Sequence, residues 1–182
     1  MKRYSLCMLA MLGVVFAFCA CGPQPRKAIY NEAAFTRYGG TGTATIKGVA
    51  FAVAADKRKM IANGFTIKCI PDNDYTDEIV KRHYWNREKL DPPDPRFAKY
   101  VRRTKADENG NFGFHGLPAG DYIVSFHANW TDPLETTDAN GEPVTEDQNS
   151  NQWVFERVSV KAGQTLVLSD EWNQGHGNIF QP

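Results

Sequence analysis

The sequence predicts an all-β protein, a seven-stranded β-sandwich with one short inserted helix. Its apolar stretches are short and rich in β-branched and aromatic residues, and several alternate with polar residues. Clusters of Gly, Pro, Asn and Asp separate these stretches, and only one stretch has helical spacing. With 182 residues, 42% of them hydrophobic, the chain has enough apolar side chains for one core.

Seven segments have the strand pattern: 43–53, 60–70, 97–105, 111–115, 121–129, 152–160 and 164–168. Two tight turns, 107–110 and 117–120, flank the fourth strand, and Gly110 is expected to adopt a positive φ. Because a branched residue would strain the second turn, Gly120→Val is expected to destabilise the fold.

Two segments interrupt the strand pattern. Residues 76–84 place Ile79, Val80, His83 and Tyr84 at helical spacing, and the prolines of 91–95 end that helix. Residues 130–151 are polar and acidic and contain no Lys or Arg, which predicts a long loop.

The N-terminus has the pattern of an export signal. Lys2 and Arg3 precede an uninterrupted apolar run over 6–20, which is too short for an ordinary membrane span. The run ends in Ala20-Cys21-Gly22 and resembles the bacterial lipobox. The resemblance implies cleavage of signal peptide 1–20 and acylation of Cys21. A plain secretory signal or a short uncleaved anchor is the alternative.

Residues 21–41 follow as a lipid-anchored tether, because they mix Pro, Gly and charge without a sustained period. The two or three acyl chains that the resemblance implies would hold the protein to the membrane. Gly22, in place of an Asp after the lipidated cysteine, favours the outer membrane within the cell envelope. Acylation of Cys21 would leave Cys69 as a lone thiol, which we expect to be buried and inert.

The segment 104–126 resembles a known domain family. Asp107, Gly110, Phe112 and Phe114, followed by Leu117, Pro118, Gly120 and Tyr122, match the pattern of the carboxypeptidase regulatory-like domain. That resemblance covers about 42–170 and implies a transthyretin-type (prealbumin/Ig-like) sandwich, with a tail over 171–182. Members of the family are mostly accessory or adhesive modules, so the resemblance implies a fold more than a function.

No catalytic motif accompanies this pattern. Intradiol dioxygenases share a similar stretch but follow it with a His-x-His pair, whereas His127 has no partner two residues away. The C-terminus lacks the Tyr-Arg-Gly-Ser motif of hydroxyisourate hydrolases. The other histidines, His83, His115 and His176, have no second ligand at short spacing. The sequence therefore predicts no enzyme, no cofactor and no metal site, and a metal-dependent enzyme of the transthyretin or dioxygenase-like type is the weakest alternative.

Three classes of partner remain to be weighed. Without residues 1–20 the chain carries 19 Lys+Arg against 21 Asp+Glu, which gives nucleic acid no basic surface. The acidic loop holds five candidate calcium donors, but their spacing matches no EF-hand, so a solvated loop is expected: Asp138, Asn140, Glu142, Glu146 and Asp147. Four tryptophans could stack on sugar rings, although core or rim positions are the simpler expectation: Trp85, Trp130, Trp153 and Trp172.

The leading functional prediction is a lipid-anchored structural or protein-binding module of the envelope, contacting its partner through sheet edges and the two insertions. A carbohydrate-binding module is the alternative. The binding residues are not determined by the sequence.

Overall fold

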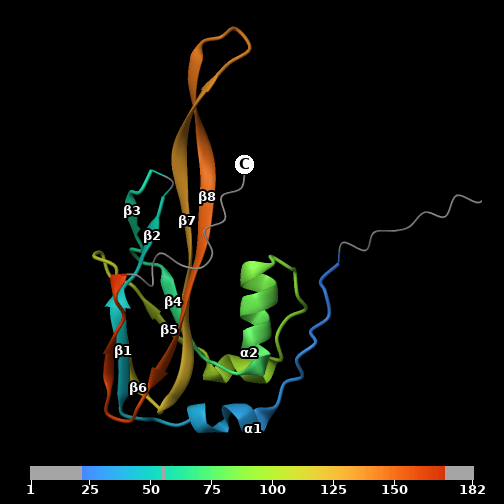
Figure 1. Cartoon of the computed structure of the whole chain (residues 1–182), viewed down its shortest axis with the longest axis vertical. Coiled ribbons are helices and arrows are strands. Elements are labelled where there is room, and N and C mark those ends of the chain that lie inside the picture. The colour runs from blue at the N-terminus through green and yellow to red at the C-terminus, as the bar shows by residue number, and fades with distance from the viewer. Residues whose placement is uncertain (1–21, 55, 171–182) are drawn as a thin grey trace, which may run out of the picture.

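The computed structural model describes residues 22–54 and 56–170. A three-stranded sheet, in the order β6-β1-β9, faces a four-stranded sheet in the order β5-β4-β7-β8 (Figure 1). The two sheets hold seven strands between them, so the predicted all-β sandwich is confirmed, and a separate β2–β3 hairpin extends one end. Signal peptide 1–20, Cys21 and the tail 171–182, with Trp172 and His176, lie outside the described residues.

The strands are β1 (Ala44–Val49), β2 (Phe51–Val53), β3 (Lys59–Ile61), β4 (Thr66–Pro71), β5 (Arg102–Lys105), β6 (Asn111–Leu117), β7 (Gly120–Thr137), β8 (Pro143–Val160) and β9 (Thr165–Val167). The helical segments are α1 (Glu32–Phe35), η1 (Thr36–Tyr38), α2 (Asp74–Glu78), the π-helix η2 (Ile79–Trp85) and the 3₁₀ helix η3 (Pro95–Tyr100).

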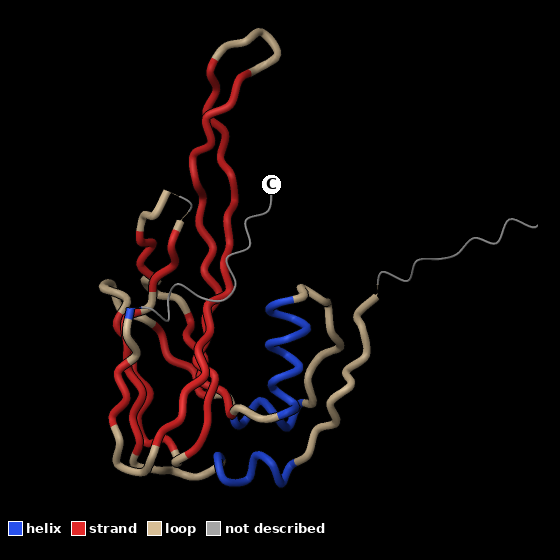
Figure 2. Tube along the Cα trace, viewed as in Figure 1, coloured by secondary structure: helices blue, strands red, loops and turns tan. Residues whose placement is uncertain are grey.

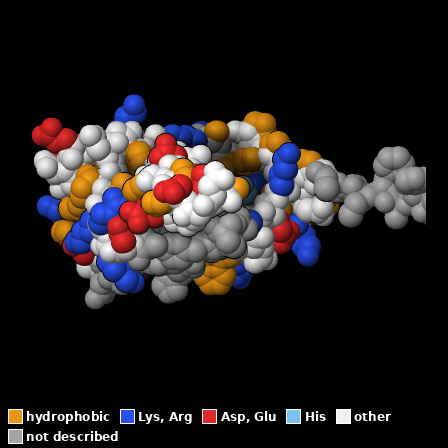
Figure 3. Space-filling model, turned by 90° about the horizontal axis from the view of Figure 1, so that it is seen from above, with side chains coloured by type: hydrophobic (Ala, Val, Ile, Leu, Met, Phe, Trp, Pro, Cys, Tyr) orange, Lys and Arg blue, Asp and Glu red, His pale blue; other side chains and the backbone are white. Residues whose placement is uncertain are grey.

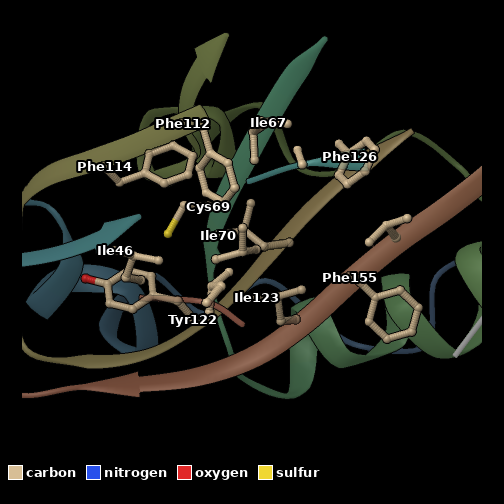
Figure 4. Close-up of a cluster of buried hydrophobic side chains, with 14 of the residues drawn as sticks. Ile46, Ile67, Cys69, Ile70, Phe112, Phe114, Tyr122, Ile123, Phe126 and Phe155 are labelled. Carbon is tan, nitrogen blue, oxygen red and sulfur yellow. The ribbon is translucent and has the colours of Figure 1, made fainter. Parts of the chain in front are cut away.

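Alternation along the strands builds the core between the two sheets. On β7, Tyr122, Val124 and Phe126 are buried on the inner side. Phe112 and Phe114 of β6 meet them from the facing sheet, as Figure 4 shows. This confirms that the apolar face predicted for 121–129 and the paired phenylalanines point into the sandwich. Their burial removes apolar surface from water, which stabilises the fold.

Cys69 of β4 lies in the same core and is fully buried. Burial raises the pKa of its thiol to about 12. The expectation that Cys69 is buried is confirmed, and its raised pKa disfavours the thiolate, which is the reactive form.

The segment 97–105, predicted as one strand, is a strand only over Arg102–Lys105. Pro95 occupies the first turn of η3, and the Asp94 carboxylate accepts the Arg96 backbone N–H at 2.9 Å, so a helical turn begins there. Phe97 and Tyr100, three residues apart, are thereby buried on one side of the turn.

Two other predicted strands are each divided. Residues 43–53 form β1 and β2 with Ala50 between them, and 60–70 form β3 and β4 around a turn at Gly64, where φ is +72°. The Ala50 N–H donates to the Gly110 carbonyl at 2.8 Å, and Gly110 has the predicted positive φ, +81°.

β7 and β8 pair in register over their full length of 18 residues each, and their outer half projects from the sandwich (Figures 1 and 2). We call residues 129–151 the arm. The prediction of a long loop over 130–151 is therefore wrong, because most of this segment is paired strand. The arm lacks apolar alternation because both its faces are exposed to solvent, so the hydrophobic pattern could not reveal it.

A tight turn closes the arm. The Asp138 carboxylate accepts the backbone N–H groups of Asn140 at 2.8 Å and Glu142 at 2.9 Å. Figure 3 looks down on this end of the molecule: acidic side chains lie near the centre of the view, and most Lys and Arg side chains lie toward its edges.

The inserted helix is confirmed, although it begins earlier than predicted. Asn73 caps α2 and forms a reciprocal capping box with Thr76. Arg157 of β8 donates to Asp72 at 3.0 Å and also bonds Asp77, which ties the insert to the four-stranded sheet. None of the helices within the described residues has the length and apolar character needed to cross a bilayer.

The prediction of a tether over 21–41 is wrong for the described residues 22–41, because this segment packs on the domain. Phe35 is fully buried, and four aromatic rings surround it at centroid distances of 5.2–6.0 Å: Tyr30, Tyr75, Phe97 and Tyr100. The N-terminal segment thus covers aromatic side chains of α2 and η3 that would otherwise be exposed.

Two carboxylates fasten this segment. Glu78 accepts the backbone N–H groups of Lys27 at 2.7 Å and Ala28 at 3.2 Å. Burial alone would raise the pKa of Glu78, but these hydrogen bonds and one from Arg82 lower it below its ordinary value. Glu32 accepts hydrogen bonds from Lys99, Tyr100 and Tyr30. These bonds lower the pKa of its carboxyl group to about 2, and the bond from Lys99 has the largest effect.

Candidate functional site

The outer face of the four-stranded sheet carries the candidate site, at the base of the arm. Because strand side chains alternate, His127 and Asn129 of β7 point away from the core. Their register partners on β8 are Trp153 and Asn151. The same face therefore presents an indole, an imidazole and two amides side by side.

The helix insert completes an aromatic surface there. Tyr84 of η2 stacks on Trp153 with a centroid distance of 4.3 Å and an interplanar angle of 16°, and His127 lies 4.4 Å from Trp153. Trp85 is 48% exposed and approaches Phe155 at 6.2 Å. We call Tyr84, Trp85, His127 and Trp153 the aromatic ridge.

A polar hollow of about 460 Å³ lies on the arm side of the ridge. His127 and Trp130 border it, and the rest of its lining is hydroxyl and amide: Asn129, Thr131, Asn149, Ser150 and Asn151. We call it the amide hollow. Its side chains offer donors and acceptors without formal charge, which suits a ligand rich in hydroxyl groups.

An apolar pocket of about 390 Å³ lies on the other side of Trp153, between the sheet and the insert. Its walls include Ile70 of β4, Ile79 and Tyr84 of η2, and the proline-rich segment 90–95. Two cations of the sheet also line it, Lys68 of β4 and Arg103 of β5. The pocket thus combines an apolar body with a basic floor.

The charges at the site act on one another. Partial burial lowers the pKa of His127, and nearby Lys68 and His83 lower it further, while a hydrogen bond with Asn151 opposes them. Burial also lowers the pKa of Lys68, with a contribution from Arg103. The lowered pKa favours the neutral form of His127, in which one ring nitrogen donates a hydrogen bond and the other accepts one.

The predicted tryptophans divide between this site and elsewhere. Trp85 is exposed and Trp153 half-buried, both on the ridge. Trp130 is half-buried beside the amide hollow, where its Nε1 donates to Asp132 at 2.6 Å. Trp85 and Trp153 thus share the outer face, whereas Trp130 alternates to the core side of β7 and packs against the core, and Trp172 lies outside the described residues.

The predicted histidines divide in the same way. His83 and His127 both contact Trp153, at centroid distances of 5.8 and 4.4 Å. His115 lies elsewhere, near the Thr45 hydroxyl at 3.4 Å.

The five acidic-loop donors do not converge. Asp138 and Asn140 are bonded to each other within the turn, and Glu146 and Asp147 lie further along β8 opposite Leu134 and Pro133. Over residues 22–54 and 56–170, no three His, Cys, Asp or Glu side chains are grouped so as to hold a metal ion.

Sequence reasoning missed the residues that the fold brings to the ridge. Tyr84 was expected only as an apolar position of the helix, and Lys68, Arg103, Asn129 and Asn151 were not singled out. The alternation of 121–129 did place His127 on the polar face. Which other side chains share that face depends on strand order, which the sequence does not reveal.

Comparison with known proteins gives a fold but no family. No protein-family model matches the chain, and no curated protein matches it in sequence. A crystal structure of a Pseudomonas aeruginosa protein, named as a candidate carbohydrate-binding protein, is similar with a TM-score of 0.57 and 22% identity. The similarity covers 78% of this chain and 97% of that one.

The major pilin subunit of Bacillus cereus is a more distant match, with a TM-score of 0.29 and 19% identity over 71% of this chain and 29% of that one. The first similarity establishes that this chain has a β-sandwich fold.

Proposed function

We propose that the chain is a lipid-anchored protein of the cell envelope whose β-sandwich binds a saccharide at the aromatic ridge, without catalysing a reaction on it. The observation that carries the proposal is the juxtaposition of the aromatic ridge, with its exposed His127 and half-buried Trp153, and the amide hollow that His127 borders. Apolar ring faces pack against the C–H faces of sugars, and uncharged amides bind sugar hydroxyl groups. The likeness to a candidate carbohydrate-binding protein supports the same function.

The anchor belongs to this proposal. Acylation of Cys21 would hold the sandwich at the membrane, and Gly22 favours the outer membrane. Mass spectrometry of the protein from its own cells should find acyl chains on Cys21, and Cys21→Ser should abolish that modification. An unmodified thiol at Cys21 would contradict the anchor and leave the binding site unaffected.

Variants of the ridge test the saccharide site. Trp153→Ala and the milder Asn151→Ala should each weaken binding in a glycan array by about fivefold, because stacking or a hydrogen bond contributes roughly 1 kcal/mol. Val167→Ala is the matched control, since Val167 is 61% exposed but lies on the other sheet. If the array detects no glycan, or if both ridge variants bind as the control does, the saccharide site is wrong.

A second candidate function, contact with an envelope protein, is favoured by the arm. β7 pairs with β4 only over Tyr122–Ser125, and β8 is the edge strand of its sheet. Both edges of the arm thus lack a neighbouring strand among the described residues, and Leu134 and Val144 are exposed on it. Open edges are templates for strand addition by another chain.

Shortening the arm tests this candidate. Thr131 and Asn149 are register partners, so an Asn-Gly turn can replace residues 132–148. We expect the melting temperature to change by only a few degrees, because the removed residues lie outside the core. Crosslinks to envelope proteins in native cells should disappear while saccharide binding is kept. Undiminished crosslinking would exclude the arm as the contact surface.

A further inference from the structure

The apolar pocket has a basic floor that nothing in the described chain neutralises. Lys68 and Arg103 are register partners on neighbouring strands, so their side chains emerge next to each other on the outer face. Neither takes part in an ion pair within the described residues. Arg103 makes one weak hydrogen bond, to the Val101 carbonyl at 3.4 Å. Like charges directly opposite each other destabilise a sheet.

The other charges around the pocket are largely engaged. The guanidinium of Arg96 donates two hydrogen bonds to the Asp94 carboxylate, at 2.9 and 2.8 Å. Arg26 donates to the Asp91 carbonyl at 3.0 Å and lies 4.0 Å from Glu78. Among the lining residues only the exposed Asp91 carboxylate remains to balance Lys68 and Arg103, so the floor keeps a net positive charge.

Burial makes that charge effective. Lys68 is half-buried beneath the insert, and the lowered pKa of its amine reflects lost solvation and the adjacent guanidinium. An anion placed between two such cations would relieve their repulsion, and the interaction is stronger where water is partly excluded.

Trp153 connects the pocket to the rest of the site. The indole lines the apolar pocket, and its neighbour His127 borders the amide hollow. A saccharide lying across the ridge would thus place one sugar residue over the amides and the next over the basic floor.

Resting on the proposed saccharide function, we infer that the ligand is acidic: the apolar pocket takes a uronic-acid residue, and Lys68 and Arg103 bind its carboxylate. The fork of Arg103 suits two carboxylate oxygens, and Lys68 adds a point charge beside it. The prolines and Ile70 would pack against the sugar ring.

The test measures binding of the full-length protein to three uronate oligosaccharides, from galacturonan, hyaluronan and alginate, and to their carboxyl-reduced forms. At least one acidic form should bind about tenfold more tightly than its reduced form, and the difference should shrink as salt is added. The double variant Lys68→Met, Arg103→Gln should lose that advantage and bind the acidic and the reduced form with the same affinity.

Lys105→Met is the matched control, because Lys105 is an exposed cation of the same strand β5 that does not line the pocket. Equal binding of acidic and reduced forms, or an undiminished preference in the double variant, would overturn the acidic ligand and leave the saccharide function standing. If neither form binds and the glycan array is also empty, the proposed function itself fails and the inference falls with it. A circular dichroism melt verifies that each variant is folded.

Discussion

Replacing Phe35 with alanine is expected to lower the free energy of unfolding by about 3–5 kcal/mol, the usual cost of removing a fully buried phenylalanine. Phe35 has no exposed surface and contacts rings from α2 and η3 as well as from its own segment. The cavity would lie where three separate parts of the chain meet, so neighbouring side chains could fill it only in part.

Urea denaturation followed by tryptophan fluorescence measures this effect through the midpoint at constant slope. Ile29→Ala is the control within the same segment, since Ile29 is 90% exposed, and it should change stability by less than about 0.5 kcal/mol. If the two variants unfold at the same urea concentration, residues 24–41 are not part of the cooperative fold.

Gly120→Val is expected to destabilise the protein by roughly 2–5 kcal/mol, the combined cost of backbone strain and overpacking. Gly120 begins β7 with φ at +156°, and a Cβ there would lie 2.8 Å from a ring carbon of Tyr38. Tyr38 is itself buried edge-on against Tyr122, at a centroid distance of 5.2 Å, so its ring cannot easily move away.

Thermal melts of Gly120→Val and of Gly40→Val make the comparison, because Gly40 has open space around its Cα and should tolerate the change. Combining Gly120→Val with Tyr38→Ala separates the two causes. A double-mutant cycle should recover part of the loss, since the clash disappears and the strain remains. Additive losses would mean that the ring contact is unimportant.

Gly120 also shows how far its neighbours in the sequence predict its role. The turn at Gly120 follows from Leu117-Pro118-Ala119-Gly120 alone, and the local backbone is enough to predict that it is sensitive to substitution. The structure adds a contact with Tyr38, 82 positions earlier in the chain, in a segment that was expected to be a tether. Local turn chemistry is encoded in neighbouring residues, whereas a contact across the fold is not.

The same division holds for the arm and for the candidate site. Alternation of apolar and polar residues predicts the strand over 121–129, because one face of that strand is buried. The same pattern is missing over 130–151, because neither face of the arm is buried. Residue type alone singles out the tryptophans as candidates for stacking on sugars, whereas the histidines have no second metal ligand at short spacing. Their meeting around Trp153 depends on β8 pairing with β7 and on η2 packing across both.

By itself the sequence determined the strand-rich fold class, the inserted helix, the turns around β6, the burial of Cys69 and the export pattern that ends at Cys21. Each follows from side-chain period or from residues close together in the chain. The tertiary structure alone decided that residues 24–41 pack on the domain, that β7 and β8 continue into an arm, and that Lys68 and Arg103 face the pocket beside Trp153. The physical reason is that burial and electrostatic interaction depend on which elements become neighbours in space, and residues far apart in the sequence carry no local signal of that neighbourhood.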